Sequence, residues 1–174
     1  MKNWFMLTLV GKDRTGIVAK ISAALYQENC NLGEASMTRL GGNFTIMLMI
    51  QFDGLAQDLD RILQPVCDSL NLHYHVDQID GELHHHLEPD VRISVHGADR
   101  AGIVADVTRA LADAGLDILN LESDVAGTSE DPLYIMNIEG VAVKGIDALN
   151  HALQTLDCGE DVEVHLSEID ILRG

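Results

Sequence analysis

Two stretches of nine residues carry, at identical spacing, residue types that bind small charged molecules. Residues 11–19 read GKDRTGIVA and residues 97–105 read GADRAGIVA. An aspartate beside an arginine offers one group for an ammonium and one for a carboxylate. The flanking glycines are typical of a turn, and the apolar residues that follow predict a helix, whose first N–H groups attract anions. The repeat therefore predicts two copies of one small-ligand site.

The candidate ligand-binding residues follow from the chemistry of a small ligand that carries both a carboxylate and an ammonium. In the first copy, N–H groups near Gly16 can receive its carboxylate, and Arg14 can grip the same group with its planar guanidinium. Asp13 can accept from the ammonium, and Asn31, just past the predicted helix, can bond either group. The candidates are Gly11, Asp13, Arg14, Thr15, Gly16, Ile17 and Asn31 in the first copy, and Gly97, Asp99, Arg100, Gly102, Ile103 and Asp117 in the second.

A purely structural interpretation of the same residues stays open. The two aspartates can cap their helices, which is worth about 1 kcal/mol each. The two arginines can form surface ion pairs worth roughly 0–1 kcal/mol. In this interpretation the only role of the glycines is to permit the turn.

The elements that must position these residues are read from hydrophobic periodicity. Alternation typical of strands and spacing typical of helices follow one another twice. Gly41 and Gly42 lie in a strong hairpin signal, and Pro65 is expected to kink or shorten its helix. The strands are predicted at 3–10, 32–40, 44–52, 72–79, 91–97, 117–126, 133–140 and 162–166, and the helices at 15–28, 55–70, 101–114 and 146–156.

Each half therefore has the order β-α-β-β-α-β, which predicts an α+β fold of two ferredoxin-like domains. Each domain is an antiparallel sheet with two helices on one face. We assign residues 1–80 to the first domain, 81–89 to a linker and 90–174 to the second. The strand at 44–52 is apolar at nearly every position, so we expect it to be buried on both faces and the sheets to pair, within the chain or across a homodimer.

Composition excludes several classes of partner. Among 174 residues, 28 acidic side chains outnumber 11 basic ones, which gives a net charge of −17. Direct binding to nucleic acid or to an anionic membrane is therefore not expected. Three scattered cysteines without a CxxC motif favour a reducing, cytoplasmic compartment, and no apolar run is long enough to span a membrane.

Metal binding and catalysis are weakly supported. The histidines at 84–86 are adjacent in the predicted linker, where neighbours rarely converge on one ion, and His73 and His75 share one face of a strand. No spacing typical of a nucleophile–base pair or of a P-loop occurs. We expect a non-enzyme without a metal or cofactor.

At this point the residues resemble a known family. The repeated G-x-D-R-x-G-I-V, between strand and helix of a βαββαβ unit, resembles the ACT domain, and the resemblance spans nearly the whole chain as a tandem pair. The stretch Asn29–Leu32, then residues 37–44 and an apolar strand, is most similar to the glycine cleavage system transcriptional repressor family. The same start also resembles the ACT domains of formyltetrahydrofolate deformylase and of some phosphoserine phosphatases.

The resemblance implies a regulator that binds an amino acid, such as glycine, and contacts a separate DNA-binding activator. Two alternatives remain: a regulatory subunit of a metabolic enzyme, and an interaction scaffold without a ligand. The two copies differ, since Thr15 corresponds to Ala101 and Asn31 to Asp117. The two sites need not bind the same ligand.

Overall fold

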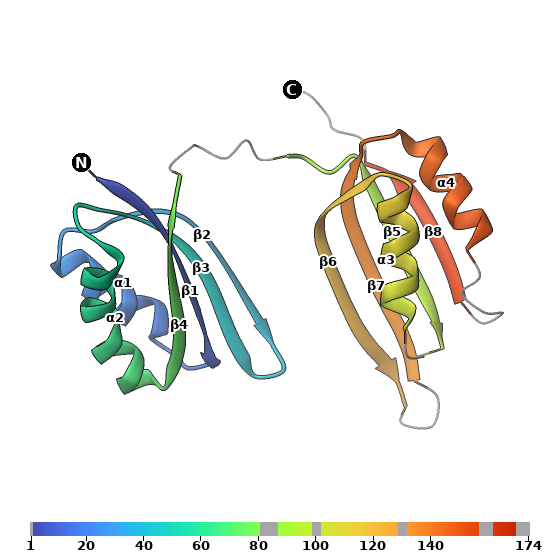
Figure 1. The fold of residues 1–174 in the computed structure, drawn as a ribbon. Coiled ribbons are helices and arrows are strands. Elements are labelled where there is room, and N and C mark those ends of the chain that lie inside the picture. The colour runs from blue at the N-terminus through green and yellow to red at the C-terminus, as the bar shows by residue number, and fades with distance from the viewer. Residues whose placement is uncertain (1, 81–86, 99–101, 129–131, 157–161, 170–174) are drawn as a thin grey trace. The chain divides into compact units, whose positions relative to one another are not determined.

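The computed structural model describes residues 2–80, 87–98, 102–128, 132–156 and 162–169. The chain divides into two compact units, Met1–His84 and His85–Gly174. Each unit has the same order of elements and the same sheet topology, as the repeat in the sequence predicts (Figure 1).

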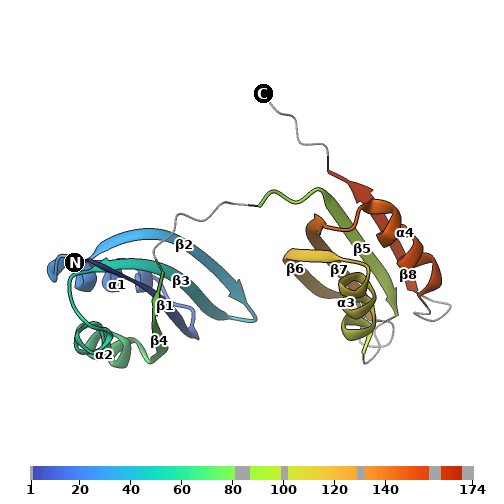
Figure 2. The ribbon, with the colours of Figure 1, turned by 45° about the horizontal axis from the view of Figure 1, so that its top comes forward.

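The first unit is a four-stranded antiparallel sheet in the order β2-β3-β1-β4. Its two helices lie on one face of this sheet (Figure 2). Strand β1 is therefore central, and its end delivers the chain to the first helix. The elements are β1 (Asn3–Lys12), α1 (Ile17–Gln27), β2 (Asn31–Leu40), β3 (Asn43–Phe52), α2 (Ala56–Leu70) and β4 (Leu72–Ile79).

The second unit repeats this arrangement with the order β6-β7-β5-β8, again with every strand pair antiparallel. Strand β5 is the counterpart of β1, and α3 is the counterpart of α1. The elements are β5 (Val91–Ala98), α3 (Ile103–Asp113), β6 (Leu116–Gly127), β7 (Pro132–Ala142), α4 (Ile146–Thr155) and β8 (Val162–Glu168). The predicted α+β, ferredoxin-like fold is confirmed.

Each core lies between the sheet and its helices because the apolar residues recur with the period of their element. On β1, Phe5, Leu7 and Leu9 are fully buried and alternate with partly exposed neighbours. Helix α1 presents Ile17, Ile21 and Leu25 to the same core at helical spacing. The first unit has its own core, and the second unit has another built around Val91, Ile93 and Val95.

The opposite face of the first sheet has no helix on it. Met47 and Val10 lie on this face and are 50% and 45% exposed. Met49, on the same face, is only 7% exposed. Within its own unit, β3 is therefore covered on one face and only partly covered on the other, whereas its apolar sequence predicts burial on both.

Pro65 does not shorten its helix, in contrast to one of the two effects expected of it, because α2 continues from Ala56 to Leu70. A proline inside a helix leaves the carbonyl four residues earlier, here that of Arg61, without its helical partner. Arg61 is exposed, so water can bond that carbonyl. Leu63 and Cys67, on either side of the proline, are fully buried, and their packing offsets the lost bond.

Candidate functional site

The first repeat forms the connection between β1 and α1. Gly16 is the N-cap of α1 and has a left-handed backbone with φ 91° and ψ 2°. The first helical hydrogen bond runs from the N–H of Lys20 to the Gly16 carbonyl, at 3.0 Å. No side chain caps this helix. Its first N–H groups, which have no partner inside a helix, are therefore not occupied by a capping side chain.

Asp13 is held by the neighbouring hairpin and does not cap α1. Its backbone N–H donates to the Gly42 carbonyl at 3.1 Å, and its carboxylate forms an ion pair with Arg39 at the end of β2. The interpretation of Asp13 as a helix cap is wrong, because Gly16 takes the cap position. Sequence reasoning missed Arg39, whose contact with Asp13 depends on how β2 and β3 pair.

The turn forms the floor of a surface hollow of about 430 Å³, a volume in the range of small-molecule sites. It is lined by residues 13–19 and by Met37, Arg39 and Phe44 from the adjacent hairpin. Five predicted residues are thus brought together. They are Asp13, Arg14, Thr15, Gly16 and Ile17.

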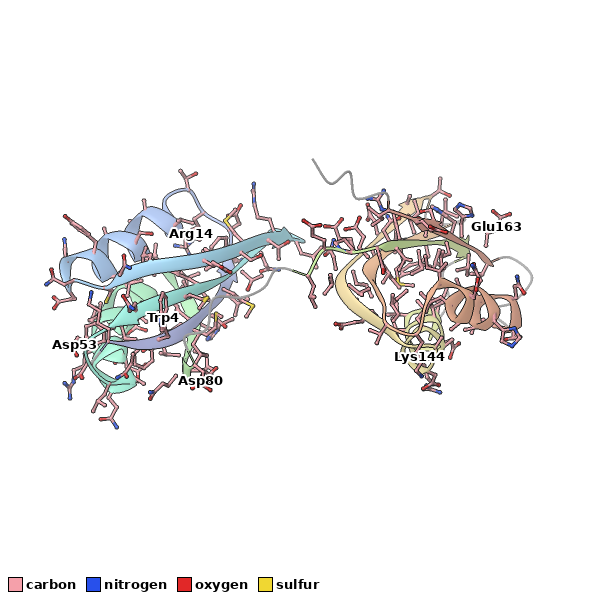
Figure 3. All side chains as sticks on the ribbon, turned by 90° about the horizontal axis from the view of Figure 1, so that it is seen from above. Trp4, Arg14, Asp53, Asp80, Lys144 and Glu163 are labelled. Atoms are coloured by element: carbon pink, nitrogen blue, oxygen red, sulfur yellow. The ribbon has the colours of Figure 1, made fainter. Side chains whose placement is uncertain are left out.

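Two basic residues, Arg14 and Arg39, line this hollow although the chain as a whole is acidic. Both are exposed, as are Lys12 and Lys20, which flank the lining residues in sequence. Arg14, labelled in Figure 3, makes no ion pair with any described residue. The hollow therefore combines an uncapped helix start with an available guanidinium.

Two other hollows of the first unit lack this combination. One lies along α2 and β4 and is bordered by the carboxylates of Asp60 and Asp68, with no lysine or arginine. The other contains Arg61, which donates to Asp58 at 2.8 Å and is thereby engaged. Neither offers an unpaired cation for a carboxylate.

Two predicted residues of the first copy lie outside the hollow. Asn31 begins β2 and pairs with Gln51, whereas the turn follows the other end of the sheet, where Lys12 pairs with Asn43. The eleven-residue α1 spans roughly 16 Å between these ends. Gly11 packs against Leu72 of β4, so its lack of a side chain serves the sheet.

The second repeat has the same backbone geometry where the structure describes it. Gly102 is the N-cap of α3 with φ 92° and ψ −10°, and Ile103 begins the helix with 2% of its surface exposed. Gly97 lies at the end of β5, and Asp117 pairs with Val141 at the far end of that sheet. The predicted ligand residues Asp99 and Arg100 lie outside the described residues.

Other ionisable groups do not form a second centre in the part of the chain that is described. The described residues contain no group of three or more His, Cys, Asp or Glu side chains placed to hold a metal. His75 contacts Asp77 at 3.0 Å, and the histidines at 84–86 lie outside the described residues. Cys30 and Cys67 are free and buried, and burial raises the pKa of Cys67 to about 11.

None of the described helices is both long and apolar enough to cross a membrane.

Comparison with known families agrees with the fold. A family model of the ACT domain matches residues 3–76, and a second ACT-domain model matches residues 91–157. Each match begins at the central strand before a repeated turn. The chain belongs to the ACT-domain family and carries two copies of the domain.

Curated relatives match part of the chain. A UPF0237 protein of Listeria monocytogenes is 37% identical over 57 residues, which is 33% of this chain and 64% of the relative. The UPF0237 protein YjhC of Lactococcus lactis is 30% identical over 84 residues, which is 45% of this chain and 94% of that protein. The chain thus spans under two thirds of the length of the first of these relatives.

Two solved structures are similar over almost the whole chain. A protein of unknown function from Galdieria sulphuraria has a TM-score of 0.75 at 24% identity, over 98% of this chain and all of that one. A protein provisionally assigned as a glycine cleavage system transcriptional repressor has a TM-score of 0.68 at 18% identity, over 98% and 99%. At these identities the likeness concerns the fold.

Proposed function

We propose that this protein is a non-catalytic regulator that responds to a free amino acid and acts through a protein partner. The observation that carries the proposal is the uncapped start of α1, set in a hollow beside the unpaired Arg14. Family membership supports it, because ACT domains are regulatory modules. The similar fold of the assigned repressor is consistent with control of transcription through a DNA-binding activator.

The ligand carboxylate is expected at the first N–H groups of α1, within reach of Arg14. A helix start carries a partial positive charge, and a planar guanidinium binds a carboxylate with two hydrogen bonds. The ammonium is expected at Asp13, which already pairs with Arg39. Ligand binding therefore competes with that ion pair and weakens the contact between Arg39 of the hairpin and Asp13 of the turn.

This competition supplies a link to a partner. Arg39 lies at the end of β2, an edge strand that is exposed along almost its whole length. A ligand that releases Arg39 from Asp13 alters the charge that this edge presents. A partner that binds at the edge of β2 would then bind the ligand-free and the ligand-bound chain with different affinities. Such a difference in affinity is what allows the ligand to control partner binding. The net charge of −17 is consistent with a partner that makes the DNA contact itself.

We also propose that the protein is a cytoplasmic homodimer. Free, buried Cys30 and Cys67 are compatible with a reducing compartment. The uncovered face of the first sheet carries the exposed Met47 and Val10, and the edge of β2 is open. Both features favour contact with a second copy of the chain, which would cover the exposed face or the open edge of this unit.

A thermal-shift panel of the twenty amino acids tests the proposal. A ligand present at a hundredfold excess over its Kd stabilises the folded chain by about 2.7 kcal/mol. Arg14→Ala should weaken binding at least tenfold, since it removes a charge-assisted hydrogen bond, and reduce this stabilisation to about 1.4 kcal/mol. The matched control is Lys20→Ala, an exposed cation of α1 that does not line the hollow.

A selective shift that Arg14→Ala weakens and Lys20→Ala preserves supports the proposal. A flat response to all twenty amino acids contradicts it and favours a scaffold without a ligand. A shift that both variants preserve places the ligand elsewhere. Capture of the partner with and without the ligand then separates a transcription activator from a metabolic enzyme.

A further inference from the structure

Tyr134 of β7 carries a buried hydroxyl that has no hydrogen-bond partner among the described residues. Only 7% of the residue is exposed. Buried polar groups are nearly always paired, because an unpaired one loses its bonds to water without replacement. An unpaired hydroxyl in this position therefore points to a partner that binds there.

The internal repeat gives Tyr134 the place that Phe44 has in the first unit. Phe44 pairs with Gly11 across the sheet, and Tyr134 pairs in the same way with Gly97. Both rings belong to the core that includes the first residue of the adjacent helix, as Tyr134 does with Ile103. At this one matching position, next to a repeated turn, the side chains of the two units thus differ by one oxygen atom: Phe44 in the first unit and Tyr134 in the second.

The first unit shows what lies behind such a turn. Phe44 lines the surface hollow at the start of α1 and also a narrow space behind it. That space is bordered by apolar side chains except for Ser22, and it would hold no more than about one water molecule. A ligand seated on this turn can therefore direct at most a very small apolar group inward.

We propose that the Tyr134 hydroxyl is a ligand-binding group of the second unit, and that it selects an amino acid whose short side chain ends in a hydrogen-bonding group. The carboxylate occupies the start of α3, and the side chain points inward to the hydroxyl. The first unit, with Phe44 in the matching place, takes an amino acid with no side chain or a small apolar one. The inference rests on the proposed function, since it assumes amino-acid binding at both turns.

Isothermal titration of the full chain with serine and with 2-aminobutyrate tests this inference. The two probes have side chains of similar size, and only serine carries a hydroxyl. The wild type should bind serine more tightly than 2-aminobutyrate. Tyr134→Phe should weaken serine binding about tenfold, the equivalent of one hydrogen bond, and change 2-aminobutyrate binding by less than twofold.

Two further measurements show whether a loss of serine binding is specific. The melting temperature of ligand-free Tyr134→Phe should equal or exceed that of the wild type, because the variant removes an unpaired buried hydroxyl. The reciprocal variant, Phe44→Tyr, should add a serine-preferring site in the first unit. A Tyr134→Phe protein with a lower melting temperature would show that the hydroxyl has a structural partner, which overturns the inference.

The inference can fail while the proposed function stands. It is overturned if Tyr134→Phe leaves serine affinity within twofold of the wild type, or if serine does not bind while other amino acids raise the melting temperature. A wild type that responds to none of the twenty amino acids overturns the proposed function, and this inference with it.

Discussion

Replacement of Gly16 by alanine should destabilise the first unit through its backbone alone. The Gly16 φ of 91° lies in the left-handed region, which costs an L-residue roughly 1–2 kcal/mol. A Cβ atom placed there would meet no heavy atom within 4 Å, so no steric clash adds to this cost. We therefore expect Gly16→Ala to lower the free energy of unfolding by about 1–2 kcal/mol.

Urea unfolding followed by tryptophan fluorescence measures this loss. Trp4 is the single tryptophan of the chain and lies on β1, so its emission reports the first unit (Figure 3). With a urea dependence of about 1 kcal/mol per molar, the midpoint should fall by roughly 1–2 M while the slope stays constant.

Two matched variants separate backbone conformation from side-chain volume. Gly16→Asn should lose less stability than Gly16→Ala, because asparagine enters the left-handed region more readily. Asn29 and Asn71 of this chain already do so, with φ of 57° and 53°. A loss below about 0.3 kcal/mol for alanine, or an equal loss for asparagine, would refute the conformational reasoning.

Three other perturbations have outcomes that follow from the structure. Arg39→Ala should cost no more than about 1 kcal/mol of stability, because the Arg39 side chain is 69% exposed, and urea titrations in 0.5 M salt should remove most of the difference from wild type. Burial raises the pKa of Cys67 from 9.0 to about 11, because the folded chain favours the neutral thiol over the thiolate. The stability that comes from this preference is complete below pH 9 and is lost as the pH rises through 11. Urea titrations between pH 8 and pH 11 should show this decline, and a Cys67→Ala chain should show less of it. Met47→Lys should convert the proposed dimer to a monomer in sedimentation velocity, because it places a charge on the uncovered face of the first sheet; an unchanged dimer would assign the contact to another surface.

Much of the fold follows from local patterns in the sequence. The alternation at Phe5, Leu7 and Leu9 predicts a strand with one buried face, and the spacing of Ile17, Ile21 and Leu25 predicts the helix after it. The repeated motif predicts one module used twice. Gly16 and Gly102, which precede the first helix of each unit, have nearly equal φ values of 91° and 92°.

The parts of the site that depend on contacts distant in sequence could not be predicted in this way. Arg39 reaches Asp13 only because the hairpin register pairs Arg39 with Phe44, which in turn pairs with Gly11. Asn31 follows the turn closely in sequence, yet an intervening helix carries it to the other end of the sheet. Local chemistry identified the turn, and strand pairing determined which side chains surround it.

Backbone amide chemical shifts during an amino-acid titration test most directly whether ligand binds at the start of α1. The ligand used is the one that gives the largest thermal shift. We expect the largest saturable changes at the amides of Gly16, Ile17 and Val18, with the same apparent Kd as the thermal shift, and their loss in Arg14→Ala. Saturable binding that leaves these three amides unchanged, with its largest changes along α2 and β4, would contradict the proposed site.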